Sequence, residues 1–136
     1  MTHPIIDLQA SIIEKLDADA ALGALIGENG IFDMPPRGRT GPYIVVLRHD
    51  LVVRDADEAP ANEHRIQFRV WNPSPSRSGV LEPAERVVLV MLQQDLGTPT
   101  LIVSNVIHQG TDTAIDVRSG RAHATIRFRI FSEPVI

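Results

Sequence analysis

The fold is decided by an alternating stretch near the end of the chain, residues 121–131, which reads RAHATIRFRIF. Apolar residues occupy every second position: Ala122, Ala124, Ile126, Phe128 and Ile130. Side chains of a β-strand point alternately to opposite faces, so this pattern predicts a strand with one buried face and one solvated face. Residues 63–71 (EHRIQFRVW) repeat the pattern, with Ile66, Phe68 and Val70 as the apolar members.

The remaining periodicity predicts helices and further strands around these two stretches. Apolar residues at helical spacing indicate an amphipathic helix over residues 4–17, with Pro4 in its first turn. A short second helix is expected over residues 18–26, capped by Asp17 and closed by Gly27. The other expected elements are strands at 31–32, 43–54 and 101–108 and a helix at about 79–94.

Two segments allow more than one interpretation. Residues 87–92 are consecutive apolar residues, which fits a buried strand as well as a helix. Polar flanks such as Arg86 and Gln93, and the absence of a turn signal before the run, favour the helix, with Pro83 in its first turn. Residues 43–47 place apolar side chains on both faces of their strand, which predicts that this strand is covered from two sides.

Together these elements predict an α+β fold, a mostly antiparallel sheet of two hairpins packed against an N-terminal helical segment and one central helix. A chain of 136 residues is large enough for one continuous core, and we expect a single domain spanning residues 1–136. With 43% apolar and 22% charged residues, the composition is that of a soluble globular protein.

Composition also argues against several classes of function. The apolar runs are far shorter than the ~20 residues that span a bilayer, and the N-terminus lacks a signal-peptide pattern, so we expect synthesis in the bacterial cytoplasm and no membrane partner. The chain has no cysteine, which removes disulfides and thiolate chemistry. The net charge of −4 argues against DNA binding as the main task.

No arrangement of residues predicts a catalytic site, a cofactor site or a metal site. His49 and His64 could meet across a hairpin, but no histidines have metal-pair spacing on a helix, and solvated histidines are the favoured interpretation. The acidic cluster at 55–63 could hold a divalent cation, but it lacks the spacing of a calcium loop and is better interpreted as a solvated loop. Residues 76–79 could bind an anion at a helix start, although helix capping is the simpler interpretation.

Arginine rows on the two alternating stretches are the strongest candidate for a binding surface. Arg65 and Arg69 share one face of their strand, and Arg127 and Arg129 share one face of the other. If the two faces coincide, the sheet carries an arginine row, which is either a solvated face paired with nearby acids or a contact for an acidic partner. The acidic loop at 55–62 is expected to be mobile in the free subunit and to become ordered against a neighbour. The candidate interface residues are Arg65, Arg69, Arg127, Arg129, Asp55, Asp57 and Glu58.

Several short motifs, in this order and at this spacing, resemble one known family. They are LDADAAL at 16–22, LIG at 25–27, PYIV at 42–45, FRVW at 68–71 and AxAxIRFR at 122–129. The set covers nearly the whole chain and resembles the tail-completion or tail-terminator family of long-tailed phages, prophages and gene transfer agents. The run at 87–92 departs from the pattern, because many members have an Ala-rich helix there.

The resemblance implies a structural, non-enzymatic subunit without a cofactor, located in the virion at the head–tail junction. It implies a homo-oligomer, a hexameric ring that caps the tail tube, stops polymerisation of the tail-tube protein and offers a surface to the head–tail connector or stopper. DNA would pass through the channel without specific binding. A closed ring would also cover sheet edges that otherwise promote aggregation.

Other interpretations stay open from the sequence. Another head–tail connector, a stopper or an adaptor, is the nearest, although adaptors are mostly helical and two hairpins are expected here. A small α+β enzyme or ligand-binding domain would need a pocket with convergent polar groups. A bacterial regulatory or toxin–antitoxin subunit is the third alternative.

Overall fold

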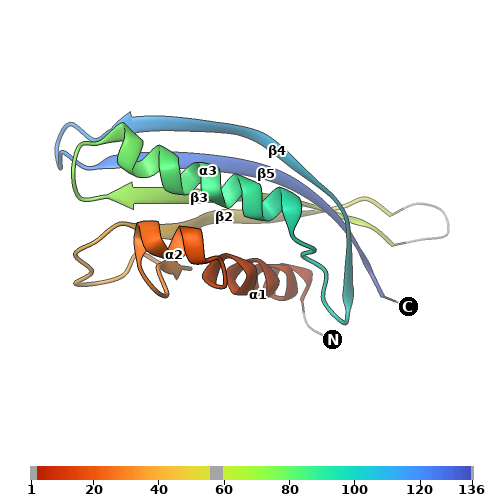
Figure 1. Ribbon diagram of the computed structural model, residues 1–136. Helices are drawn as coiled ribbons and strands as arrows, with labels where there is room; N and C mark the ends of the chain where they lie inside the picture. Colours follow the sequence, from red (N-terminus) through yellow and green to blue (C-terminus); the bar gives the residue numbers. More distant parts are fainter. Residues whose placement is uncertain (1–2, 56–59, 136) are drawn as a thin grey trace.

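The computed structural model describes residues 3–55 and 60–135, which form a two-layer α+β fold with three helices on one face of a five-stranded sheet (Figure 1). The helices are α1 (Pro4–Asp17), α2 (Ala20–Ile26) and α3 (Arg77–Gln93). The strands are β1 (Ile31–Phe32), β2 (Tyr43–Val53), β3 (Asn62–Asn72), β4 (Leu101–Ile115) and β5 (Ala122–Pro134). The expected fold class, with its two antiparallel hairpins and its helical layer, is confirmed.

The strand order β1-β2-β3-β5-β4 places the two alternating stretches side by side in the middle of the sheet. β3 and β5 pair antiparallel, with Phe68 opposite Ile126 and Ile66 opposite Phe128. β1 alone among the described strands runs parallel to its neighbour, β2. Opposite residues of an antiparallel ladder point to the same side, so the apolar members of both stretches share one face.

The hydrophobic core lies between this face and the helices. The rings of Phe68 and Phe128 are fully buried and meet edge to face, with their centroids 6.1 Å apart. The run at 87–92 is helical, as favoured: Val87 and Met91 are buried in the core, while Leu92 is 50% exposed. Burying each such aliphatic side chain contributes on the order of 1.5–3 kcal/mol. None of the described helices is both long and apolar enough to cross a bilayer.

The element boundaries that differ from the sequence-based expectation include those of α2, α3 and β4. The cap of α2 is Asp19 rather than Asp17, since the Asp19 Oδ2 atom accepts from the Leu22 N–H at 2.9 Å. α3 begins at Arg77 after the cap Ser76, which leaves Pro83 inside the helix instead of in its first turn. β4 extends to Ile115 rather than ending at residue 108, because register shifts after residues 103 and 108 break its alternation without ending the strand.

The strand starting at Tyr43 is buried on both faces over residues 43–46, as the sequence predicted, although helices cover only one of these faces (Figure 1). Ile44 and Val46 face the core, whereas Tyr43 lies on the face without helices. Tyr43 is nevertheless only 6% exposed, because the guanidinium of Arg121 lies 5.6 Å from its ring centroid. A long arginine side chain therefore covers this part of the strand in place of a second layer.

Candidate subunit-contact surface

The face of the sheet opposite the helices carries both arginine rows. In the β3–β5 register, Arg65 is opposite Arg129, Gln67 is opposite Arg127 and Arg69 is opposite Thr125. Because opposite residues share a face, the four predicted arginines lie on one surface, here termed the arginine face (Arg65, Arg69, Arg127 and Arg129). The structure therefore brings together the two rows that the sequence left on separate strands.

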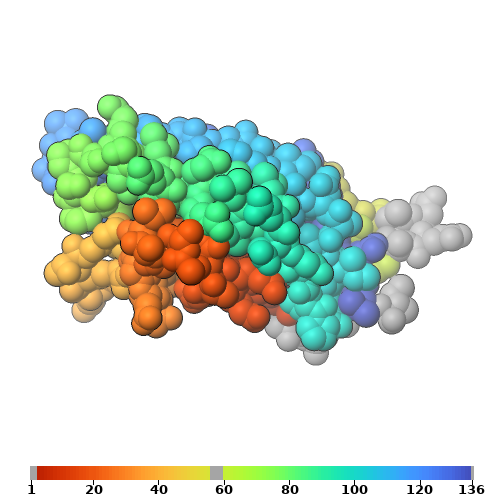
Figure 2. Space-filling model, in the orientation of Figure 1, coloured from red at the N-terminus to blue at the C-terminus, as the bar shows by residue number. Residues whose placement is uncertain are grey.

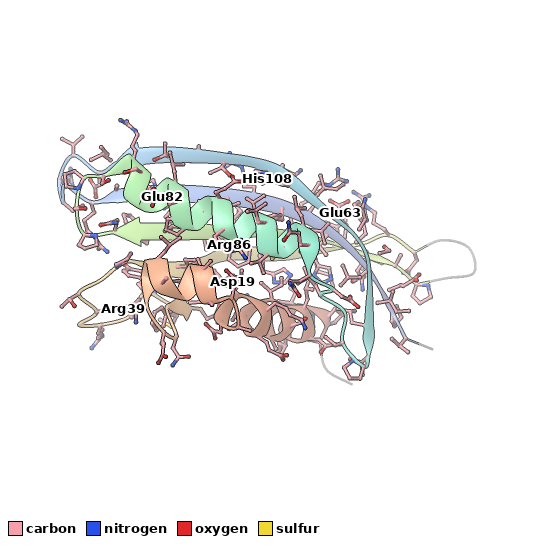
Figure 3. The ribbon with its side chains drawn as sticks, in the orientation of Figure 1. Asp19, Arg39, Glu63, Glu82, Arg86 and His108 are labelled. Atoms are coloured by element: carbon pink, nitrogen blue, oxygen red, sulfur yellow. The ribbon has the colours of Figure 1, made fainter. Side chains whose placement is uncertain are left out.

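A buried carboxylate, Glu63, binds several guanidinium groups at one end of the arginine face (Figure 3). The Glu63 side chain is 1% exposed and accepts from Arg65 at 2.7 Å, from Arg54 at 3.3 Å and from two nitrogens of Arg129 at 3.1 Å. The hydrogen bond from Arg129, followed by that from Arg65, lowers the pKa of Glu63 to about 2. One carboxylate among these guanidinium groups leaves a net positive charge at this end of the face.

Repulsion between Arg65 and Arg129 is thus relieved inside the subunit, as the alternative of a solvated face paired with nearby acids expects, and a contact with an acidic partner stays a prediction. Arg127 also has an internal partner, with its Nη1 atom 2.7 Å from Asp112 Oδ2. Asp55 instead accepts from the Ala61 N–H at 3.1 Å and forms no ion pair among the described residues. Asp57 and Glu58 lie outside the described residues.

A cluster of cations and aromatic rings that the sequence did not single out occupies the other end of the same face. The Arg121 guanidinium lies 5.0 Å from the Trp71 ring centroid and donates to the Tyr43 hydroxyl at 3.0 Å. The Arg69 guanidinium lies 5.8 Å from the same indole and donates to Thr125 Oγ1 at 3.0 Å. The available signal was positional: Trp71 ends one alternating stretch and Arg121 begins the other, and antiparallel pairing brings these ends together.

A buried polar chain links His49, His64 and Ser132 on the core side of the sheet. His64 is fully buried, with its Nδ1 atom 2.8 Å from His49 Nε2 and its Nε2 atom 2.9 Å from Ser132 Oγ. The interpretation of solvated histidines was therefore wrong, because the hairpin register turns both rings toward the core face. The pKa of each imidazole is lowered to about 4, chiefly by burial, and repulsion from His64 contributes to the shift of His49.

The tautomers of His49 and His64 follow from the one ring nitrogen of the pair that has no hydrogen-bond partner among the described residues. His49 Nδ1 is buried without a hydrogen-bond partner among the described residues. If both rings donate through Nε2, the unsatisfied atom is a lone pair rather than an N–H, which is the cheaper arrangement. We therefore assign donation from His49 to His64 and from His64 to Ser132.

Glu63 and Ser76, two of the residues considered for cation or anion binding, form hydrogen bonds inside the fold. Within residues 3–55 and 60–135 there is no group of three or more His, Asp or Glu side chains arranged to hold a metal ion. Glu63, the last member of the acidic cluster, is bonded to arginines. Ser76 accepts from the Gly79 N–H at 3.1 Å, which confirms the capping interpretation of residues 76–79.

Comparison with known proteins agrees with the resemblance noted in the sequence. Among solved structures, a chain from "Virion of native gene transfer agent (GTA) particle" is similar, with a TM-score of 0.84 and 19% identity over 97% of this chain and 99% of that chain; at this identity the likeness shows the fold. No curated protein matches the chain. The model of the family described as Tail completion protein gp17 matches residues 10–133. The chain therefore belongs to the Tail completion protein gp17 family and is a structural protein of a phage-type virion tail.

Proposed function

We propose that the chain is a tail terminator, a ring subunit that ends polymerisation of the tail-tube protein and joins the tail to the head connector. The match to the tail completion family over residues 10–133 carries this proposal, because completing a tail requires a protein that closes the growing tube. The shared fold with a chain of a gene transfer agent virion supports it. The role requires binding surfaces and no chemistry, so we propose a single, non-enzymatic domain over residues 1–136.

The distribution of charge supports assembly into a ring, which we propose has six copies. The helices and adjoining segments are acidic: Asp7, Glu14, Asp17, Asp19, Glu28, Glu82, Glu85 and Asp95 against Lys15, Arg39, Arg77 and Arg86. The opposite side is basic: Arg48, Arg54, Arg65, Arg69, Arg121, Arg127 and Arg129 against Asp50, Glu63, Asp112, Asp116 and Glu133. Because acids and bases lie on opposite sides, the basic side of one copy can meet the acidic side of the next, and such head-to-tail contacts close into rings.

In this assembly the arginine face contacts acidic groups of a neighbour, while the ends of the ring contact the tail-tube protein and the connector or stopper. DNA passes through the channel without specific binding, in keeping with the net charge of −4. The free subunit is monomeric, because termination has to wait for a finished tube. Light scattering of the purified chain tests this last point directly.

The test of the function is to delete the gene and to reconstruct particles from the parent strain. The deletion should yield tails of uncontrolled length and unjoined heads, and the reconstruction should place a six-membered ring of this chain between tail tube and connector. A ring that contacts the connector and not the tube would identify a stopper instead. A single copy, or a position away from the junction, would reject the proposal.

A further inference from the structure

Two arginines on the basic side, Arg69 and Arg121, have no carboxylate partner among the residues that the structure describes. By contrast, Arg65, Arg127 and Arg129 all lie within ion-pair distance of an acid. Both guanidinium groups lie against the half-buried Trp71, the only tryptophan of the chain. Tryptophan and arginine are the residue types that most often dominate the energy of a protein interface. Arg69, Trp71 and Arg121 are therefore termed the Trp71 patch.

An acidic groove lies on the other face of the same sheet, between α3 and β4, which run side by side in Figure 2. It measures about 630 Å³, and Leu81, 39% exposed, contributes its apolar part. Glu82 and Glu85 line it and form no ion pair with any described residue. On the β4 side the His108 ring lies against Phe128, with centroids 5.4 Å apart, so this wall is fixed by packing (Figure 3).

The sheet register places one end of the patch, Arg69, beside one end of the groove, Thr111, while Trp71 lies farther along the strands, at the height of His123 and Ala114. Arg69 of β3 is opposite Thr125 of β5, and Thr125 is opposite Asp112 of β4. Thr111, the neighbour of Asp112, lines the groove. Rotation about an axis parallel to the strands keeps every residue at its height, so the patch of one copy can reach the groove of the next with a shift of only a few residues along the strands.

We propose that the Trp71 patch of one subunit docks into the acidic groove of the next subunit. This inference rests on the ring of the proposed function and specifies the contact that closes it. Arg69 and Arg121 bind Glu82 and Glu85, and Trp71 packs against Leu81. Because patch and groove lie on opposite faces of one sheet, the contact joins two different surfaces and repeats around the ring, with each copy overlapping the next.

The test is a charge swap between copies, read as the yield of joined particles with tails of normal length. One variant carries Arg69→Glu and Arg121→Glu, and the other carries Glu82→Arg and Glu85→Arg. Each variant alone places like charges at every contact and should lower the yield at least roughly tenfold. When the two variants are produced together and alternate around the ring, every patch again meets a groove of opposite charge, and the yield should recover. Such alternation requires a ring with an even number of copies. Asp33→Arg and Arg118→Glu, exposed charges outside patch and groove, are the matched controls and should leave the yield unchanged.

Recovery of the yield on co-production also shows that both variants fold. If the patch variant unfolds, the proposal is tested with the groove variant alone, because it is changed only at exposed helix positions. Normal yield from the groove variant alone overturns the proposal. So does failure of two folded variants to recover together. If a reconstruction shows the ring but these charge changes have no effect, the tail-terminator function stands and this contact does not. If there is no ring at all, the function itself fails.

Discussion

Glu63 on β3 and Arg129 on β5 are 66 residues apart in the sequence, and Arg129 donates to both carboxylate oxygens of Glu63 at 3.1 Å. Arg65 donates to the same carboxylate at 2.7 Å. This ion pair joins the two alternating strands on their solvated side, while Phe68 and Phe128 join them on the core side. The middle of the sheet is therefore held from both faces.

Glu63→Gln should lower the free energy of unfolding by about 1–2 kcal/mol, because charge-assisted hydrogen bonds are lost but the arginine partners are partly hydrated. The matched control is Asp112→Asn, which removes the exposed pair with Arg127 and should cost under about 1 kcal/mol. Urea denaturation of both variants measures the difference. Equal losses of unfolding free energy in the two variants would show that the burial of Glu63 adds nothing to the stability of its ion pairs.

Acidification should destabilise the subunit in two steps. His49 and His64 have folded-state pKa values of about 4, below the ordinary 6.5, so their contribution is intact above pH 6.5 and is lost as the pH falls toward 4. Glu63 has a folded-state pKa of about 2, below 4.5, so its contribution is lost only as the pH falls from 4.5 toward 2. Melting temperatures measured between pH 8 and pH 2 should follow this order.

The upper step can be assigned to the buried histidine chain with a variant at its centre. His64→Gln retains hydrogen-bonding groups but does not titrate, so the melting temperature should fall less between pH 6.5 and pH 4 than in the parent. The variant should also be less stable than the parent at pH 7.5, because the bonds to His49 and Ser132 are disturbed. An unchanged slope in that window would exclude the histidines as its cause.

Asp19 connects α2 to α3, and Asp17 does not. Asp19 caps α2 through the Leu22 N–H and accepts two hydrogen bonds from Arg86, at 2.7 and 2.8 Å (Figure 3). Asp19→Ala should therefore cost about 1–2 kcal/mol in unfolding free energy, chiefly through the lost cap. Asp17→Ala, two residues earlier, should change it by less than about 0.5 kcal/mol. A larger effect at Asp17 would restore the cap assignment made from the sequence.

The turn between β4 and β5 requires glycine at one position. Gly120 has φ +70° and donates its N–H to the Asp116 carbonyl at 2.8 Å. Gly120→Ala should destabilise the hairpin by about 1–2 kcal/mol, because an L-residue is strained in this conformation. Gly110→Ala is the control in the same hairpin, since its φ is not positive and a Cβ there meets no atom within 4 Å. Thermal unfolding should show a loss for the first substitution only.

The sequence alone determined the class of fold, the inward side chains of the two central strands and the helical state of residues 87–92. Alternation, helical spacing and capping residues are local properties, and they act through neighbours within a few positions of the chain. Local signals did not predict which of two residues close in the sequence caps a helix. Asp19 rather than Asp17 caps α2, because α1 continues to Asp17 and α2 begins directly after Asp19, which also accepts from Arg86 on a helix far later in the chain.

The candidate contact surface was determined only by the tertiary structure. No local pattern shows that Arg65 is opposite Arg129, that Glu63 binds both, or that Arg121 covers Trp71 and Tyr43. These contacts depend on the register between strands far apart in the chain, and a shift of one residue would turn every side chain to the other face. Burial of Phe68 and Phe128 against the helices selects that register, so the hydrophobic core decides which charges meet on the opposite side of the sheet.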